Sequence, residues 1–163
     1  MGYDLNNANQ HFGFSVFAWS FVLDLAKEFG WQPMGTVLSE TTAKIYLDEE
    51  ERSNEETIQE TIRSWEGNYD GNNYQSVVDK DALNLANALD NALKVIPDKR
   101  NPAYNTLLSL TDDTTGLNYF KMVFRGIKSI YPGSPVDYFS GIENKKYLKE
   151  FIQFCKCGSF SIH

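Results

Sequence analysis

The sequence is poor in the side chains that bind transition metals and act as nucleophiles. Its 163 residues include only two histidines, His11 and His163, and two cysteines, Cys155 and Cys157. Two cysteines separated by one residue have the wrong spacing for a zinc knuckle, and no second Cys/His pair accompanies them. A catalytic pair of Cys155 with either histidine stays open, although nothing in the pattern singles it out. Cysteines this close do not staple a fold, which favours a reducing, cytoplasmic location.

The sequence signatures of nucleotide-binding proteins and of common hydrolases are also missing. The chain holds neither G-x-x-x-x-G-K-[ST] nor G-x-G-x-x-G, and it has no G-x-S-x-G nucleophile elbow. Carboxylates are adjacent at residues 48–51 and 112–113, but these runs are hydrophilic, and catalytic carboxylates need burial or charged neighbours. We therefore expect a protein that is not an enzyme and that has no catalytic residues, cofactor or metal.

Long apolar runs and excess positive charge are absent as well. The most apolar stretch is too short to span a bilayer as a helix, and residues 1–4 lack the positive charge of a secretory signal. Lysine and arginine number 15 against 22 for aspartate and glutamate, so the net charge is −7. An acidic surface repels nucleic-acid phosphates and anionic lipids. We expect neither nucleic acid nor a membrane as partner, whereas a basic protein is compatible.

The chain does contain enough apolar and aromatic surface for a folded core. Hydrophobic residues make up 42% and aromatic residues 14%, a composition that argues against disorder. Residues 14–29 predict a helix with a wide apolar stripe, which Gly30 caps and Pro33 prevents from continuing. Residues 79–96 predict the clearest amphipathic helix, with Asp79 as its N-cap. Its alanine-rich face is expected to pack against the helix of residues 14–29.

Shorter patterns predict the remaining elements. Further helices are expected over residues 54–65, 102–110 and 117–131, and from about residue 145 to Gly158. Ser53 and Glu56 form a capping-box pattern at the start of the first of these. Short strands are expected over residues 41–47, 74–78 and 159–162, and residues 1–12 are expected to be an irregular lead-in or an edge strand. The sequence thus predicts a mainly α, α+β fold: one compact domain over residues 1–163 with about five helices and a small β element.

Most of the negative charge lies in one segment. Residues 40–66 hold nine acidic and three basic residues, so this segment carries −6 of the net −7. Tryptophans and tyrosines flank it, and such rings are enriched at binding hot spots, although they also commonly cap a core. The candidate binding residues are Glu49, Glu50, Glu51, Glu55, Glu56, Trp65 and Tyr69.

Residues 68–79 raise the separate question of a calcium loop. Oxygen-bearing groups fall at positions one, three, five, seven, nine and twelve of an EF-hand-like pattern. Position six is Asn73 instead of glycine, and the bidentate glutamate of position twelve is replaced by Asp79. An Asx-rich turn accounts for this stretch better than a calcium site.

Five stretches of the chain carry a resemblance to other proteins. They read Met-Gly-Tyr-Asp-Leu at 1–5, Gly-Trp-Gln-Pro-Met-Gly-Thr at 30–36, Asp-Ala-Leu through Ala-Leu at 81–93, Phe-Ile-Gln-Phe-Cys at 151–155 and Gly-Ser-Phe-Ser-Ile at 158–162. In these stretches the chain resembles a group of small uncharacterised bacterial proteins of unknown function. The resemblance implies a bacterial or phage protein of the cytoplasm. It implies no activity, so no functional residue can be carried over.

Taken together, these features favour a non-enzymatic binding protein that engages a basic protein through its acidic segment. A toxin-neutralising immunity protein or a phage-borne inhibitor has this profile. The alternative is a small-molecule or metabolite-binding domain with an aromatic-lined pocket between the apolar helices. An enzyme of unfamiliar type ranks below both.

Overall fold

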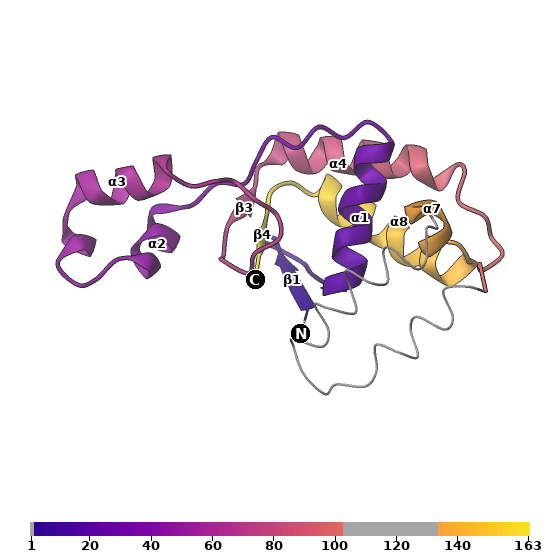
Figure 1. Ribbon diagram of the computed structural model, residues 1–163, viewed down its shortest axis with the longest axis horizontal. Coiled ribbons are helices and arrows are strands. Elements are labelled where there is room, and N and C mark those ends of the chain that lie inside the picture. The colour runs from indigo at the N-terminus through magenta and orange to yellow at the C-terminus, as the bar shows by residue number, and fades with distance from the viewer. Residues whose placement is uncertain (1, 103–133) are drawn as a thin grey trace.

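The computed structural model describes residues 2–102 and 134–163. The helices predicted over residues 102–110 and 117–131 lie outside the described residues, apart from Pro102. The fold is mainly α with a small antiparallel sheet, so the predicted α+β class is confirmed. The described residues form six α-helices and four strands, and Figure 1 shows that two of these helices, α2 and α3, project away from the rest.

The sheet joins the two ends of the described chain. Its strands are β1 (Gly2–Asn6), β2 (His11–Ser15), β3 (Ser76–Val77) and β4 (Phe160–Ile162). They lie in the order β2-β1-β4-β3, and all neighbours are antiparallel. The strand predicted at residues 159–162 is confirmed, and it occupies a central position. The expectation of a lead-in or edge strand at residues 1–12 is wrong for β1, because β4 pairs with the side of β1 that β2 leaves open.

The side chains of the sheet alternate between an apolar and a polar face, as the two-residue period of a strand requires. Register pairs such as Tyr3 with Phe14 and Leu5 with Ile162 belong to the apolar face. That face joins the main hydrophobic core, to which it contributes Tyr3, Leu5, Phe14, Val77, Phe160 and Ile162. The opposite face carries Asp4, Asn6, His11, Gly13, Ser161 and His163.

Helix α1 (Val16–Glu28) begins two residues later than its apolar run, because Phe14 and Ser15 belong to β2. The Ser15 hydroxyl accepts a hydrogen bond from the Ala18 N–H and so caps the helix. At the other end Gly30 has a φ of +96°, and the Trp31 N–H donates to the Ala26 carbonyl at 2.9 Å. This is the Schellman arrangement, and it confirms the predicted glycine cap.

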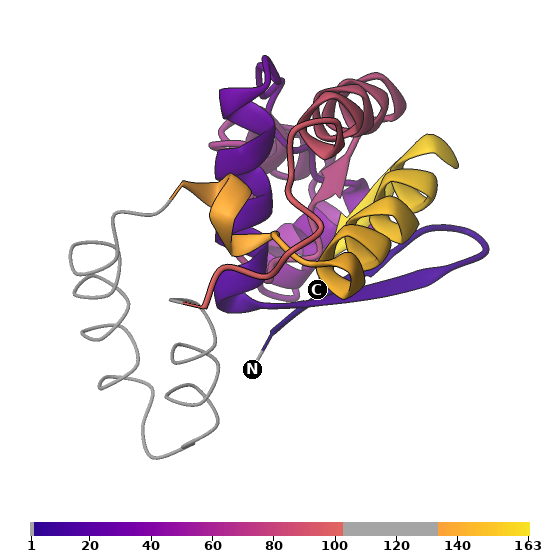
Figure 2. The same cartoon turned by 90° about the vertical axis from the view of Figure 1, so that its right-hand side faces the viewer.

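Three further helices complete the body of the molecule: α4 (Asp79–Leu93), α7 (Pro135–Tyr138) and α8 (Ile142–Lys156). Helix α4 packs against α1, as predicted, and also against α8. Figure 2 shows these helices gathered on one side of the β1–β2 hairpin. The N-cap of α4 is Val78, so the prediction of Asp79 as N-cap is wrong. The Asp79 carboxylate instead accepts a hydrogen bond from the Ser159 N–H and joins α4 to the approach to β4.

The projecting part contains α2 (Glu40–Ala43), two 3₁₀ turns (Lys44–Tyr46 and Glu51–Ser53) and α3 (Glu55–Arg63). The strand predicted over residues 41–47 is therefore wrong. Ser39 caps the Thr42 N–H at 3.1 Å, and this cap starts a helix where the β-forming residues suggested an extended chain. The cap predicted for α3 is also off by one residue, because the Asn54 side chain accepts from the Glu56 and Thr57 N–H groups.

None of the helices within residues 2–102 and 134–163 has the length and hydrophobicity that crossing a bilayer requires. The longest, α4 and α8, have 15 residues each, and both carry charged side chains on the face turned away from the core.

The cap at Gly30 gives a prediction about stability. Replacing Gly30 with alanine should lower the free energy of unfolding by about 1–2 kcal/mol, because a Cβ is disfavoured at positive φ. No atom lies within 4 Å of the position that this Cβ would occupy, so the cost is conformational rather than steric. Urea denaturation measures the change. The control is Gly13→Ala in extended β2, where the nearest atom is 3.6 Å from the new Cβ. An equal loss in both variants would contradict the explanation.

Candidate functional site

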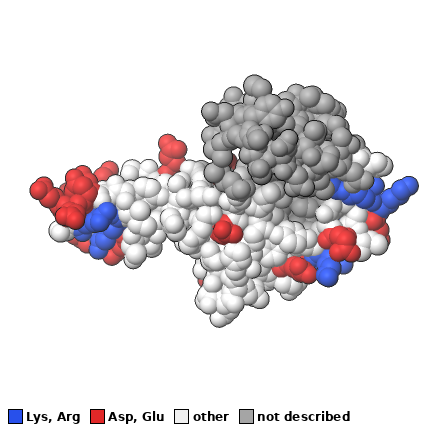
Figure 3. Space-filling view, turned by 90° about the horizontal axis from the view of Figure 1, so that it is seen from below, with Lys and Arg blue, Asp and Glu red and all other residues white. Residues whose placement is uncertain are grey.

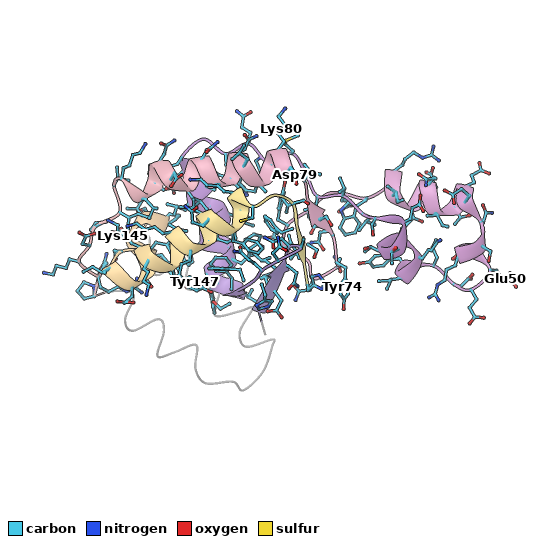
Figure 4. The ribbon with its side chains drawn as sticks, turned by 180° about the vertical axis from the view of Figure 1, so that it is seen from behind. Glu50, Tyr74, Asp79, Lys80, Lys145 and Tyr147 are labelled. Atoms are coloured by element: carbon cyan, nitrogen blue, oxygen red, sulfur yellow. The ribbon has the colours of Figure 1, made fainter. Side chains whose placement is uncertain are left out.

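The acidic segment forms a separate projection, which we name the acidic arm (residues 40–66). It stands away from the sheet and from α1, α4 and α8, and the viewer sees Glu50 at its far end in Figure 4. The space-filling view in Figure 3 shows acidic side chains gathered at the end of the molecule that the arm forms. A segment that carries −6 is thus presented on one projecting element instead of being spread over the surface.

Little of this charge is neutralised within the described residues. All five candidate glutamates, Glu49, Glu50, Glu51, Glu55 and Glu56, are exposed. The arm's one described ion pair joins Arg63 to Glu60 at 3.1 Å, and both side chains are well exposed. The Arg52 Nε–H donates to the carbonyl oxygens of Lys44 and Leu47, so it supports the backbone. The arm therefore keeps a strong negative field that an approaching cation would meet.

The acidic arm has a small core that fixes its own shape. Ile58 of α3 is 2% exposed, and Ala43 of α2 is fully buried where the two helices meet. Trp65, a candidate binding residue, is half-buried at the base of the arm, and its Nε1–H donates to the Thr36 hydroxyl at 3.0 Å. The glutamates are thus held on a folded support.

A buried carboxylate fastens the arm to the body. Asp81, in the first turn of α4, has no exposed surface. Its Oδ1 accepts from the Trp31 Nε1–H at 2.8 Å and from the Met34 N–H at 3.4 Å, and its Oδ2 accepts from the Tyr69 hydroxyl. The same hydroxyl accepts from the Gly35 N–H at 2.9 Å. The chain entering the arm and the chain leaving it therefore meet at one carboxylate, an arrangement that we name the Asp81 network.

Tyr69 is consequently placed in the interior and not on the binding surface proposed for it. It is 8% exposed, and burial together with the hydrogen bond to Asp81 raises the pKa of its hydroxyl well above the ordinary value. Close backbone contact reinforces this junction, since the Thr36 N–H donates to the Gly67 carbonyl at 2.9 Å. Gly67 has a φ of +68°, and a Cβ there would approach the Thr36 backbone to 3.2 Å. Glycine is needed at this crossing.

The loop suspected of binding calcium accepts hydrogen bonds from protein donors at the backbone carbonyls of Asp70 and Gly71. The buried Gln75 side chain donates to the Gly71 carbonyl and accepts from the Asn73 N–H at 2.9 Å. The Tyr3 hydroxyl donates to the Asp70 carbonyl at 2.6 Å. Within residues 2–102 and 134–163 no three His, Cys, Asp or Glu side chains are grouped as a metal ion would require. Tyr3 and Gly2 of β1 are thus both bonded to this loop, the second through the Asn72 side-chain amide.

The structure also brings together residues that the sequence did not connect. Both histidines lie on the polar face of the sheet, where His11 Nε2 is 3.1 Å from Asp4 Oδ1 and His163 Nε2 is 2.7 Å from the Ser161 hydroxyl. The strand register places them there, and no local pattern joins positions so far apart in the chain. Cys155 lies elsewhere, fully buried on α8, and burial raises its pKa well above the ordinary thiol value. Such a thiol stays protonated and is a poor nucleophile.

The alternative of an aromatic-lined pocket receives no support from the described residues. The rings between the sheet and α8 contact one another, as with Phe14 and Phe151 at 4.8 Å and Phe154 and Phe160 at 5.4 Å, and so fill the core. An open depression of about 340 Å³ lies between the end of α1 and α4, but its walls carry Asn84, Asn87 and Asn91 with Phe29 as their aromatic member. It is a polar surface feature.

The Asp81 network predicts a pH-dependent stability. Replacing Tyr69 with phenylalanine should cost about 1.5–3 kcal/mol at neutral pH, since a hydrogen bond to a carboxylate is lost and the Gly35 N–H loses its acceptor. A tyrosine whose pKa is raised by folding stabilises the native state below the unfolded pKa of about 10 and loses that contribution as pH rises above it.

Urea denaturation between neutral and strongly alkaline pH measures this effect. The wild type should lose stability more steeply above about pH 10 than Tyr69→Phe does. Tyr3→Phe is the control, because it removes the hydroxyl of another tyrosine whose pKa is raised by burial. The Tyr3 hydroxyl donates to a backbone carbonyl and makes no bond to Asp81. Parallel alkaline slopes for the wild type and Tyr69→Phe would contradict the role given to Tyr69.

Similarity to known proteins gives no indication of function, so the function has to be inferred from this geometry. The chain matches none of the known family models, curated proteins or solved structures with which it was compared. The features that bear on function are therefore the acidic arm, the Asp81 network at its base and the surface beside it.

Proposed function

We propose that this protein is a non-enzymatic binding protein that engages a basic protein through the acidic arm. The observation that supports the proposal is the presence of five exposed glutamates on a folded projection that keeps −6 of the net −7. Folding does not account for this clustering of negative charge, because exposed charges of one sign repel one another and lower stability. The arrangement is useful where a cationic surface has to be attracted.

Long-range attraction is the first contribution of the arm. Single exposed ion pairs add little to affinity, about 0–1 kcal/mol each, but a patch of one sign accelerates association with an oppositely charged partner. The Asp81 network adds a second contribution. It fixes the chain on both sides of the arm, so we expect less conformational freedom to be lost on binding. An acidic arm held at its base in this way suits fast and selective capture of a basic protein.

Neutralisation of a toxin, or inhibition of a host or competitor protein by a phage-borne factor, would use these properties. Capture of a basic protein through an acidic surface both masks that protein's charge and blocks its contacts with nucleic acid or other acidic targets. The two free cysteines, one of them exposed, suit a reducing, cytoplasmic setting for this activity.

Charge reversal on the arm tests the proposal. Glu49, Glu50 and Glu56 are exposed and have no side-chain hydrogen bond or ion pair with any other described residue, so Glu49→Lys, Glu50→Lys and Glu56→Lys together should leave the fold intact. The probe is a fluorescently labelled peptide of alternating arginine and serine, and binding is followed by anisotropy. We expect the triple variant to bind about tenfold more weakly or worse, with a flatter salt dependence.

A matched triple variant on the body controls for net charge. Glu28→Lys, Glu143→Lys and Glu150→Lys change the total charge by the same amount at exposed positions of α1 and α8. It should bind the peptide within about threefold of the wild type. If both triple variants weaken binding equally, the attraction comes from overall charge, and the assignment to the acidic arm is wrong.

A further inference from the structure

A row of aromatic rings runs from the base of the acidic arm to the sheet. The Tyr46 ring is 6.4 Å from the Trp65 ring, and its hydroxyl donates to the Asn73 carbonyl at 2.7 Å, next to Tyr74. The Tyr74 ring in turn contacts the imidazole of His163 edge-on, with centroids 4.6 Å apart. We name these four side chains the aromatic row. They come from four separate parts of the chain, and Figure 4 shows Tyr74 where the arm leaves the body.

Two members of the aromatic row are exposed, although most of the large rings among the described residues are buried. Tyr46 is 47% exposed and Tyr74 is 49% exposed, whereas Trp19 and Trp31 are at most 3% exposed. Two members of the row are held by hydrogen bonds, because the Tyr46 hydroxyl donates to the Asn73 carbonyl and the Trp65 Nε1–H donates to the Thr36 hydroxyl. An exposed tyrosine whose hydroxyl is bonded, as that of Tyr46 is, offers contact area at little entropic cost.

The backbone at Tyr74 is a second, independent sign that this ring serves the surface. Tyr74 is the one non-glycine residue at positive φ among the described residues, at +59°. A bulky side chain is uncommon in that conformation, which glycine or asparagine adopts more easily, and both occur just upstream in the same loop. Half of the Tyr74 side chain remains in water, so core packing does not compensate for the unfavourable conformation. Strained residues of this kind cluster at binding sites.

The chemistry of the row indicates its ligand. The face of an aromatic ring is electron-rich and attracts a cation placed over it, most often an arginine guanidinium, which also stacks on the ring. The neighbouring arm concentrates a charge of −6, which selects a positively charged partner. The Tyr46 hydroxyl donates to the Asn73 carbonyl, and burial together with the nearby Tyr74 raises the pKa of this hydroxyl.

We propose that the aromatic row is the anchoring site for an arginine side chain of the basic partner, which stacks on Tyr46 and Tyr74 while the arm's glutamates attract the rest of that partner. This site deepens the function proposed above and rests on it. It divides recognition into two parts: charge at the far end of the arm brings the partner in, and rings at the base hold one cationic side chain.

Two single variants and two peptides test the site. Tyr74→Gly removes the ring and suits the positive φ, and Tyr46→Leu keeps apolar bulk but removes the π face. The probes are the arginine–serine peptide and the same peptide with citrulline, which is neutral but similar in shape to arginine. Each variant should bind the arginine peptide about fivefold or more weakly, and should leave the much weaker binding of the citrulline peptide unchanged. Tyr147→Leu is the matched control, an exposed tyrosine on α8 that should bind like the wild type.

Tryptophan fluorescence supplies a readout at the site itself. Trp19 and Trp31 are buried, so of the chain's three tryptophans Trp65 is the one that solvent reaches. The arginine peptide should change its emission in the wild type, and much less in Tyr46→Leu. The melting temperature of each variant, expected to stay within a few degrees of the wild type, verifies folding.

The outcomes separate the two proposals. If the arm's triple lysine variant loses binding while Tyr74→Gly and Tyr46→Leu retain it, the row is not the anchor, and the proposed function stands. If the triple variant binds normally, the proposed function fails and the anchoring site fails with it. If the tyrosine variants weaken both peptides equally, the row is an apolar contact and the assignment of a cation is wrong.

Discussion

The structure depends on one buried carboxylate. Asp81 is removed from water in the first turn of α4, a position that would be costly for a carboxylate without hydrogen-bond donors. Three donors meet it, from Trp31 just after α1, from Met34 at the entry to the acidic arm and from Tyr69 at its exit. Loss of any one donor would leave the charge underpaired in the interior. The same carboxylate therefore holds the chain on both sides of the arm and the segment that follows α1.

The bonds to Asp81 fix the position of the two ends of the charged segment. The stretch between Trp31 and Tyr69 could have been a long, mobile insertion, since loop closure penalises extra length only weakly. Fastened at both ends to the same carboxylate, it holds its glutamates away from the body and its base against the sheet. The aromatic row exists for the same reason, because Tyr46 and Trp65 belong to the arm whereas Tyr74 and His163 belong to the body.

Local signals sufficed for the elements whose ends are set by neighbouring residues. The glycine cap of α1, the amphipathic pattern of α4 and the alternation of β4 were all readable, because caps and periodicity are properties of short stretches. The pairing of the strands could not be predicted from the sequence. Nothing local shows that β4 lies between β1 and β3, and the β-forming residues near Ala43 gave way to a helix started by Ser39. Asp81 looked like an ordinary acid in a first helical turn. The glutamates could be selected from composition, but the aromatic row required the fold.

Tyr69 and Tyr74 show why the candidate site needed the structure. They are five residues apart in one turn-rich loop, and composition treats them alike. Tyr69 points inward, where burial and Asp81 raise its pKa and where its hydroxyl fastens the arm. Tyr74 points outward at positive φ with its ring half exposed. The buried hydrogen bond of Tyr69 stabilises the fold, whereas the positive φ of Tyr74 costs some of that stability. Glycine or asparagine would adopt the conformation of position 74 more easily, and in the proposed anchoring site the exposed ring of Tyr74 is the part that stacks on arginine.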